Sequence, residues 1–246
     1  MTTVPPLERP VAEVDEAAAV RNRYARRCGD DERYSILNAA VMYATHERQR
    51  AMIELFRSLH VNPRVTRLVE VGCGTGKNLL EFLRFDFQPE HLLGIELLDE
   101  SAAQARAIVP NALRIITGDA ADPTCCAIPP ASQDIVFQST VFSSLLDDSF
   151  QERLAARMRS WLRPGGGILW YDFTVDNYRN ADVRGVPLRR IRQLFPDGRL
   201  QYRRLTLAPP IARFVTRVHP ALYPLVSHCS GLRTHVLAWI QRPDGA

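Results

Sequence analysis

The sequence has no apolar run long enough to cross a membrane. None of its stretches approaches the ~18 uninterrupted apolar residues that a spanning helix needs, and Met1–Pro10 lacks the apolar core of a signal peptide. We therefore expect a cytoplasmic protein without a membrane span. Contact with a membrane surface stays open, because peripheral attachment leaves no such trace in a sequence.

Cysteine is scarce, and the excess of charge is small. The five cysteines include no C-x-x-C pair, and no histidine cluster has metal-ligand spacing, so we expect a reduced protein without a metal. Lys and Arg number 31 against 27 acidic residues, an excess too weak to predict a nucleic-acid partner. At 246 residues, with 46% hydrophobic and 24% charged residues, the chain has the composition of one globular domain.

Short β-like runs alternate with helical patterns through the middle of the chain. Strands are predicted at 67–71, 92–97, 113–117, 134–137 and 168–173, and helices at 77–84, 99–108 and 149–162. Strands that alternate with helices indicate a parallel sheet joined by right-handed crossovers.

The two flanks differ from this pattern. Residues 1–20 are predicted to fray or to drape over the domain, because prolines precede an alanine- and acid-rich piece. An amphipathic helix is predicted within 34–60: Met52, Leu55, Phe56 and Leu59 form its apolar stripe, and Glu47, Arg48 and Arg50 take the other positions. In the tail we expect a short basic helix at 186–194, strands at 200–207 and 232–240, and between them an apolar insertion rich in helix-limiting prolines.

A glycine-rich loop follows the first strand, with the sequence Glu70-Val71-Gly72-Cys73-Gly74-Thr75-Gly76. Glycine lets a ligand approach the backbone closely and tolerates positive φ. A dinucleotide site needs G-x-G-x-x-G, but here the third glycine follows the second by two residues. A P-loop needs a glycine where Val71 stands and Ser or Thr where Asn78 stands. The spacing therefore excludes both nucleotide sites.

Further residues extend the pattern of an acid followed by three alternating glycines. Glu96 ends the second strand, Gly118-Asp119-Ala120 follows the third, Asp134–Phe137 forms the fourth, and Leu162–Gly166 precedes the fifth. In their order and spacing these elements resemble the motifs of class I S-adenosylmethionine-dependent methyltransferases.

The resemblance implies a fold, a cofactor and a set of site residues. The fold would be α/β, a Rossmann-like doubly wound seven-stranded sheet, mostly parallel with an antiparallel last strand. Residues 1–60 would form a lid segment and pre-core helix, and 61–246 the methyltransferase domain with a cap insertion near 208–231. The cofactor would be S-adenosylmethionine, with S-adenosylhomocysteine as product. Its expected contacts are Glu70, Gly72, Cys73, Gly74, Thr75, Gly76, Asn78, Glu96, Leu97, Asp119, Ala120, Gln138 and Tyr34.

Within that set the resemblance assigns individual roles. Glu70 would orient the amino-acid end of the cofactor, Glu96 would accept hydrogen bonds from the ribose hydroxyls, and Asp119 would pair with the adenine amino group. Tyr34 would lie in a lid that encloses the sulfonium. Glu96 could instead be an acid at a helix N-terminus, and Asp119 could simply begin a turn.

The sequence indicates the catalytic residues less clearly than the cofactor contacts. Asp172, at the end of the fifth strand, and His46 are candidate bases, while Asp172 could equally be a turn residue. Asn177, Tyr178 and His235 are further candidates, and the role of Thr140 is left undecided. Tyr43 could enclose the cofactor, although plain helix packing is favoured.

We expect the enzyme to methylate a small-molecule hydroxyl, on a sugar or natural-product intermediate, in biosynthesis. Gln138–Val141 lacks the motif of enzymes that methylate bases or glutamine, which argues against those substrates. The alternatives are a protein or RNA methyltransferase, or an inactive binding protein on the same fold. We expect a monomer or homodimer with no nucleic-acid partner. The insertion could cap the acceptor site, pair with a second subunit or touch a membrane surface; capping is the first choice and dimerisation the second.

Overall fold

The computed structural model describes residues 15–26, 35–176 and 180–243. The predictions made for Tyr34, Asn177 and Tyr178 lie outside this part of the chain. Among the residues it describes, no helix is long and apolar enough to span a bilayer.

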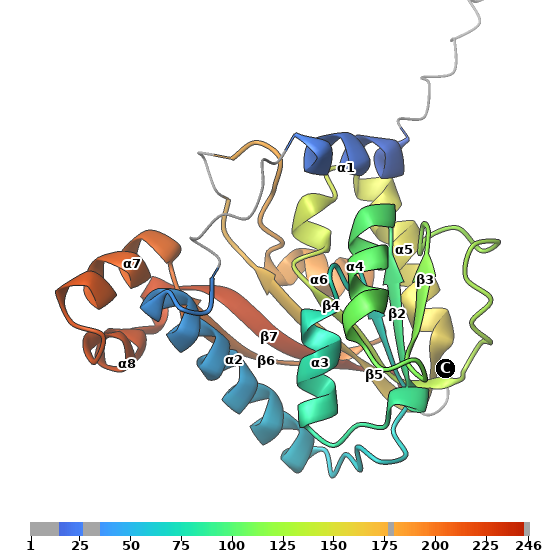
Figure 1. Cartoon of the computed structure of the whole chain (residues 1–246), viewed down its shortest axis with the longest axis horizontal. Coiled ribbons are helices and arrows are strands. Elements are labelled where there is room, and N and C mark those ends of the chain that lie inside the picture. The colour runs from blue at the N-terminus through green and yellow to red at the C-terminus, as the bar shows by residue number, and fades with distance from the viewer. Residues whose placement is uncertain (1–14, 27–34, 177–179, 244–246) are drawn as a thin grey trace, which may run out of the picture.

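A seven-stranded sheet forms the centre of the molecule, with the strand order β3-β2-β1-β4-β5-β7-β6 (Figure 1). Six strands run in one direction, and β7 pairs antiparallel with both β5 and β6. The predicted fold class is therefore confirmed. The strands are β1 Leu68–Val71, β2 Leu92–Glu96, β3 Arg114–Thr117, β4 Gln133–Ser139, β5 Leu162–Phe173, β6 Arg199–Leu207 and β7 Arg233–Gln241.

Helices cover both faces of the sheet. On one face, α2 and α3 pack with the side chains of Leu68, Phe137 and Leu169. On the other face, α5 and α6 pack with Val69, Val136 and Trp170. Because neighbouring strand residues point to opposite faces, each buried strand contributes to both layers. The helices are α1 Glu16–Ala25, α2 Ala39–Ser58, α3 Lys77–Arg84, α4 Asp99–Ile108, α5 Asp148–Trp161, α6 Leu188–Leu194, α7 Pro209–Val218 and α8 Leu222–Ser227, with short 3-10 turns η2 Pro89–His91, η3 Phe142–Ser144 and η4 Ser230–Leu232.

The N-terminal flank corrects one prediction. Residues 16–20, part of the segment predicted to fray or drape, belong to the regular helix α1, and Asp15 caps the first turn of this helix. Ala17 and Val20 pack into the core, and the buried Arg23 pairs with Glu16 at 2.5 Å. The apolar positions are small, so this helix has little apolar periodicity to detect in the sequence.

The tail corrects a second expectation. The apolar insertion, expected to be limited by its prolines, contains the two helices α7 and α8. Pro209 and Pro210 occupy the first turn of α7, where a proline removes no internal hydrogen bond. The strand β5 also begins earlier than predicted, at Leu162, directly after α5 ends at Trp161.

The glycine loop and the other candidate site residues at the strand ends lie at one edge of the sheet. The carboxyl ends of the parallel strands meet there, and antiparallel β7 begins there, with His235 paired to Phe173. In open α/β sheets, ligands bind at this edge.

Candidate active site

The glycine loop leaves β1 in a conformation that side chains disfavour. Gly72, Gly74 and Gly76 have φ values of +66°, +53° and +82°. A Cβ atom on Gly72 would lie 2.5 Å from Val141 Cγ2, whereas a Cβ on Gly74 would meet nothing within 4 Å. Gly72 therefore permits close packing of the loop, and Gly74 faces open space into which a ligand fits.

Glu70 is fully buried beneath this loop. Asn78 Nδ2 donates a hydrogen bond to Glu70 Oε1 (2.7 Å), while Glu70 Oε2 has no partner among the described residues. Burial raises the pKa of Glu70 to about 8, against the opposing effects of Asn78 and Arg48. A buried carboxyl oxygen without a partner is costly, and a ligand donor can satisfy it.

Glu96 connects the end of β2 to the glycine loop. Its Oε2 accepts from the backbone N–H of Gly74 (2.7 Å), and its Oε1 accepts from that of Leu98 (2.9 Å). Burial raises the pKa of this carboxyl. Each carboxylate oxygen can accept a second hydrogen bond, so Glu96 holds the loop and retains acceptor capacity.

The backbone brings the remaining loop residues together. Cys73 N–H donates to Ile95 O (3.0 Å), and Gly118 N–H donates to Glu96 O (2.8 Å). The half-buried Asp119 accepts from Ala121 N–H (2.8 Å), the pattern of an Asx turn. Thr75 and Leu97 are half-buried and Ala120 is buried. The carboxyl ends of β1, β2 and β3 thus form one continuous rim.

Two residues at the ends of β4 and β5 point inward in this structure. Gln138 is fully buried, accepts from Val141 N–H (3.0 Å) and donates to Tyr171 O (3.4 Å). Asp172 is also fully buried and accepts from the N–H groups of Ser143 (3.1 Å) and Phe173 (2.9 Å). Burial raises the pKa of Asp172 to about 7. Asp172 has no exposed surface and holds η3 in place through its hydrogen bond with Ser143.

Thr140 follows β4 with a φ of +57°. A β-branched residue in this region is strained, and such strain gathers at functional sites. Its N–H donates to Tyr171 O (2.8 Å), which fixes the turn, and its side chain is exposed at the edge.

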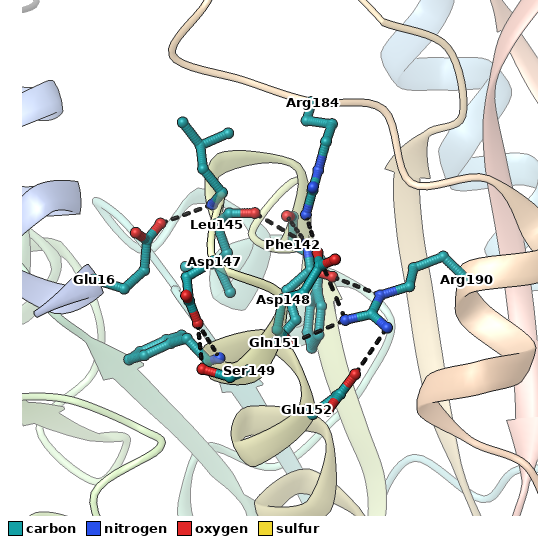
Figure 2. Close-up of polar contacts among 12 residues, drawn as sticks. Glu16, Phe142, Leu145, Asp147, Asp148, Ser149, Gln151, Glu152, Arg184 and Arg190 are labelled. Atoms are coloured by element: carbon teal, nitrogen blue, oxygen red, sulfur yellow. Dashed lines mark hydrogen bonds and ion pairs between the residues drawn. The ribbon is translucent and has the colours of Figure 1, made fainter. Parts of the chain in front are cut away.

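The segment after β4 is held from three sides, as Figure 2 shows. Glu16 of α1 accepts from Leu146 N–H (2.7 Å). From the chain after β5, Arg184 pairs with Asp148, and Arg190 of α6 bonds to Gln151 (3.0 Å) and Glu152 (2.9 Å). Gln151 in turn donates to the backbone oxygens of Phe142 and Leu145. These contacts fix the wall of the edge next to Thr140.

Comparison with known proteins indicates a methyltransferase domain in this part of the chain. The family model for methyltransferase domains matches residues 68–166, the segment that contains the glycine loop, Glu96 and Asp119. Residues 68–166 of the chain are therefore similar to a methyltransferase domain. The methyltransferase uses S-adenosylmethionine as cofactor and leaves S-adenosylhomocysteine as product. No curated protein sequence matches the chain at a significant level.

Solved structures agree with this fold. An S-adenosylmethionine-dependent methyltransferase from Thermotoga maritima is 16% identical, with a TM-score of 0.59, covering 92% of this chain and 98% of that one. One from Mesorhizobium loti is 15% identical, with a TM-score of 0.57 and coverage of 78% and 98%. A Haloferax volcanii methyltransferase, solved with the Trm112 activator, is 18% identical, with a TM-score of 0.54 and coverage of 88% and 100%. At these identities the likeness establishes the fold.

The residues of the methyltransferase loop fit the cofactor. The partnerless oxygen of Glu70 suits an ammonium group, and the spare acceptor capacity of Glu96 suits hydroxyl donors. When bound, the cofactor supplies an activated methyl group on a sulfonium. The chain's own task is then to bind, to orient the two reactants and to exclude water, and orientation can supply ~7–11 kcal/mol of a barrier.

The sequence missed Arg48, because its position on α2 suggested a solvent-facing residue. Arg48 donates to Asn78 Oδ1 (3.0 Å) and Glu81 Oε2 (2.9 Å), and its guanidinium lies 5.3 Å from the centre of the Tyr171 ring. Its neighbour Glu47 is buried and accepts from Thr206 N–H (3.0 Å). Both side chains point toward the sheet, where Glu47 binds the backbone of Thr206 and Arg48 lies over the Tyr171 ring.

His235 completes a polar wall that runs from the glycine loop through Arg48 and Tyr171. Its ring stacks on Tyr171 (5.1 Å, 18°), and its Nδ1 lies 3.0 Å from Thr234 Oγ1. Burial and then the charge of Arg48 lower the pKa of His235 to about 4. By contrast His46 is exposed on α2, and Tyr43 stacks on Tyr223 (5.2 Å, 13°), in keeping with the favoured role in helix packing.

A cavity of about 290 Å³ lies elsewhere, at the opposite edge of the sheet. Asn62, Asp134 and Trp239 are among its lining residues. The assignment of the active site therefore depends on the geometry of the loop and the strand ends.

Proposed function

We propose that the enzyme transfers the methyl group to a hydroxyl of a small molecule, a sugar or natural-product intermediate in biosynthesis. The observation that carries this proposal is the imidazole of His235 at the edge where β5 ends. Burial lowers the pKa of this ring to about 4, so the ring is neutral at pH 7, and a neutral imidazole nitrogen can accept a hydrogen bond from the attacking hydroxyl and orient it for methyl transfer.

The cofactor contacts predicted from the sequence remain part of this proposal. Glu70, Glu96, Asp119 and the glycine loop are proposed to bind the amino-acid end, the ribose and the adenine, in the order of the strands. The open space beside Gly74 and the partnerless oxygen of Glu70 support the assignment. Gln138 and Asp172 are proposed to shape the wall of the site through the backbone groups that they bind.

The division of the chain supports a small acceptor. We propose that residues 61–246 form the catalytic domain, that 1–60 supply a lid and the pre-core helix, and that the insertion near 208–231 caps the acceptor side. The packing of α7 and α8 against α2 and β6 supports this arrangement. A monomer or a homodimer is compatible with it.

The test supplies the purified enzyme and methyl-labelled cofactor to a cell extract divided into metabolites and macromolecules. We expect label in an extractable metabolite whose mass and nuclear magnetic resonance spectrum show a methyl ether. Label that stays in protein or RNA would favour those substrates instead. Calorimetry that shows no binding of S-adenosylmethionine or S-adenosylhomocysteine would favour an inactive scaffold.

A second experiment separates cofactor binding from orientation of the acceptor. Once the acceptor is identified, His235→Asn should lower kcat about a hundredfold, while the Kd for S-adenosylhomocysteine stays within about twofold, since the imidazole is proposed to meet only the acceptor. His46→Asn is the matched control, because its ring is exposed on α2. Equal kcat in all three proteins would remove His235 from the reaction.

A further inference from the structure

One end of the molecule is built from the start of α2 together with α7 and α8, as Figure 1 shows. The inner side of this end is packed: Ala40 of α2, Ala212 and Val215 of α7, and Tyr223 of α8 form a small core of their own. The outer side of α7 and α8, which we name the cap face, is free of these packing contacts.

Exposed hydrophobic side chains gather at this end. Of the ten large hydrophobic residues that are exposed in the described part of the chain, five belong to it: Ile36, Leu37, Phe214, Val218 and Leu225. Leu37 is 93% exposed, and Phe214 and Leu225 are each 68% exposed. Scattered exposed apolar residues need no explanation, but a concentration at one end marks an interaction surface.

The charge on the cap face has a single sign. Residues 208–231, which include α7 and α8, contain Arg213 and Arg217 and no acidic residue. Residues 35–46, which lead into and begin α2, contain no acidic residue either. The cap face is therefore positively charged, although the whole chain has nearly equal numbers of basic and acidic residues, 31 and 27.

Within α7 the two properties run side by side. Phe214 and Val218 are four residues apart and form an apolar row, while Arg213 and Arg217 have the same spacing and form a basic row beside it. All four residues are exposed. Helices that lie in a membrane interface combine these two features, an apolar row that enters the headgroup region and cations that meet the lipid phosphates.

We propose that the cap face docks the enzyme reversibly on an anionic lipid bilayer. Phe214, Val218 and Leu225 enter the headgroup region, and Arg213 and Arg217 bind lipid phosphates. Three apolar side chains on short helices give a weak attachment, so the arginines and the anionic surface must both contribute.

Charge argues against a second copy of the chain as the occupant. In a two-fold dimer the same surface faces itself, so the rows of Arg213 and Arg217 would meet each other in segments that contain no acidic residue to pair with them. Nucleic acid would engage the arginines but would leave the exposed Leu37, Phe214 and Leu225 without a partner.

The test is sedimentation of the full-length protein with vesicles. We expect binding to vesicles of equal parts phosphatidylglycerol and phosphatidylcholine, and little binding to pure phosphatidylcholine. Arg213→Gln with Arg217→Gln should weaken the partition coefficient about thirtyfold. Phe214→Ser with Val218→Ser should weaken it at least about tenfold.

The matched control is Arg64→Gln with Val65→Ser. These two residues are adjacent in the sequence and are also a basic and an apolar residue with exposed side chains, but they lie between α2 and β1, outside the cap face. This variant should bind vesicles as the unmodified protein does, and all variants should keep their affinity for S-adenosylhomocysteine. Equal binding to both kinds of vesicle, or no binding, would overturn the proposal. A dimer in light scattering that Phe214→Ser dissociates, without lipid binding, would assign the face to self-association.

Discussion

At the scale of single residues, the glycine loop shows how backbone conformation creates a binding site. Gly74 has a φ of +53° and opens onto free space. An L-residue in this conformation costs about 1–2 kcal/mol, which a domain of this size tolerates. A large side chain here would therefore fill the cofactor space without displacing any packed atom.

We predict that Gly74→Arg abolishes measurable binding of S-adenosylhomocysteine while the protein stays folded. Isothermal calorimetry measures binding, and circular dichroism measures the fold. Gly231→Arg is the control, since a Cβ on Gly231 also meets nothing within 4 Å but lies far along the chain at η4. Unchanged affinity in Gly74→Arg would remove the loop from the site.

The raised pKa of Glu70 predicts that a proton is released when the cofactor binds. Its pKa of about 8 keeps the free enzyme largely protonated at this position at pH 7. An ammonium group of the cofactor beside it would lower that pKa, so binding at pH 7 should release up to about one proton. Calorimetry in buffers of different ionisation enthalpy measures the release, which Glu70→Gln should eliminate. Equal release from both proteins would contradict the contact.

At the scale of elements, α1 is positioned by one buried pair. Arg23 pairs with Glu16 and donates to Ser144 O (2.9 Å), and Glu16 accepts from Leu146 N–H. These contacts fix α1 against the segment that follows β4. Removing one partner leaves the other charge buried without compensation.

We expect Arg23→Ala to lower the free energy of unfolding by about 3 kcal/mol and to speed hydrogen exchange at Leu146. Chemical denaturation and exchange mass spectrometry measure the two effects. Arg26→Ala is the matched control, because Arg26 pairs with Asp182 in an exposed bridge, and its loss should cost less than about 1 kcal/mol. Equal losses in both variants would show that α1 is not held by the buried pair.

At the scale of the whole molecule, three buried groups with large pKa shifts contribute to the dependence of stability on pH. The folded pKa values of Glu70 (about 8) and Asp172 (about 7) lie above their ordinary values. Their contribution to stability is therefore lost as pH rises. The folded pKa of His235 (about 4) lies below the ordinary 6.5, so its contribution is lost as pH falls below 6.5.

Above pH 6.5, only the two carboxyls among these three groups still change protonation on unfolding. Because both release a proton on unfolding in this range, the free energy of unfolding should fall between pH 6.5 and 8. Glu70→Gln should flatten this slope, which denaturant titrations at a series of pH values measure. A slope that is the same in both proteins would mean that Glu70 titrates normally in the fold.

The sequence by itself determined the glycine loop, the alternation of strands and helices, and the order of the motifs. These features depend on neighbours in the chain: positive φ at Gly72 and Gly74, short apolar strand runs, and helices such as Lys77–Arg84, found at their predicted bounds. The spacing within one segment reflects these local preferences, so the parallel α/β class followed from the sequence pattern, whereas the cofactor followed from the resemblance of the motifs to class I methyltransferases.

Only the tertiary structure decided which polar side chains face the site. Glu47 meets Thr206 and Tyr223 across separations of 159 and 176 residues, and Arg23 meets Ser144 across 121. The spacing on α2 made Arg48 look like a solvent-facing residue, yet its partners on α3 and β5 draw it inward. Whether a charged side chain is buried depends on a distant partner that can satisfy it, and no local pattern contains that information.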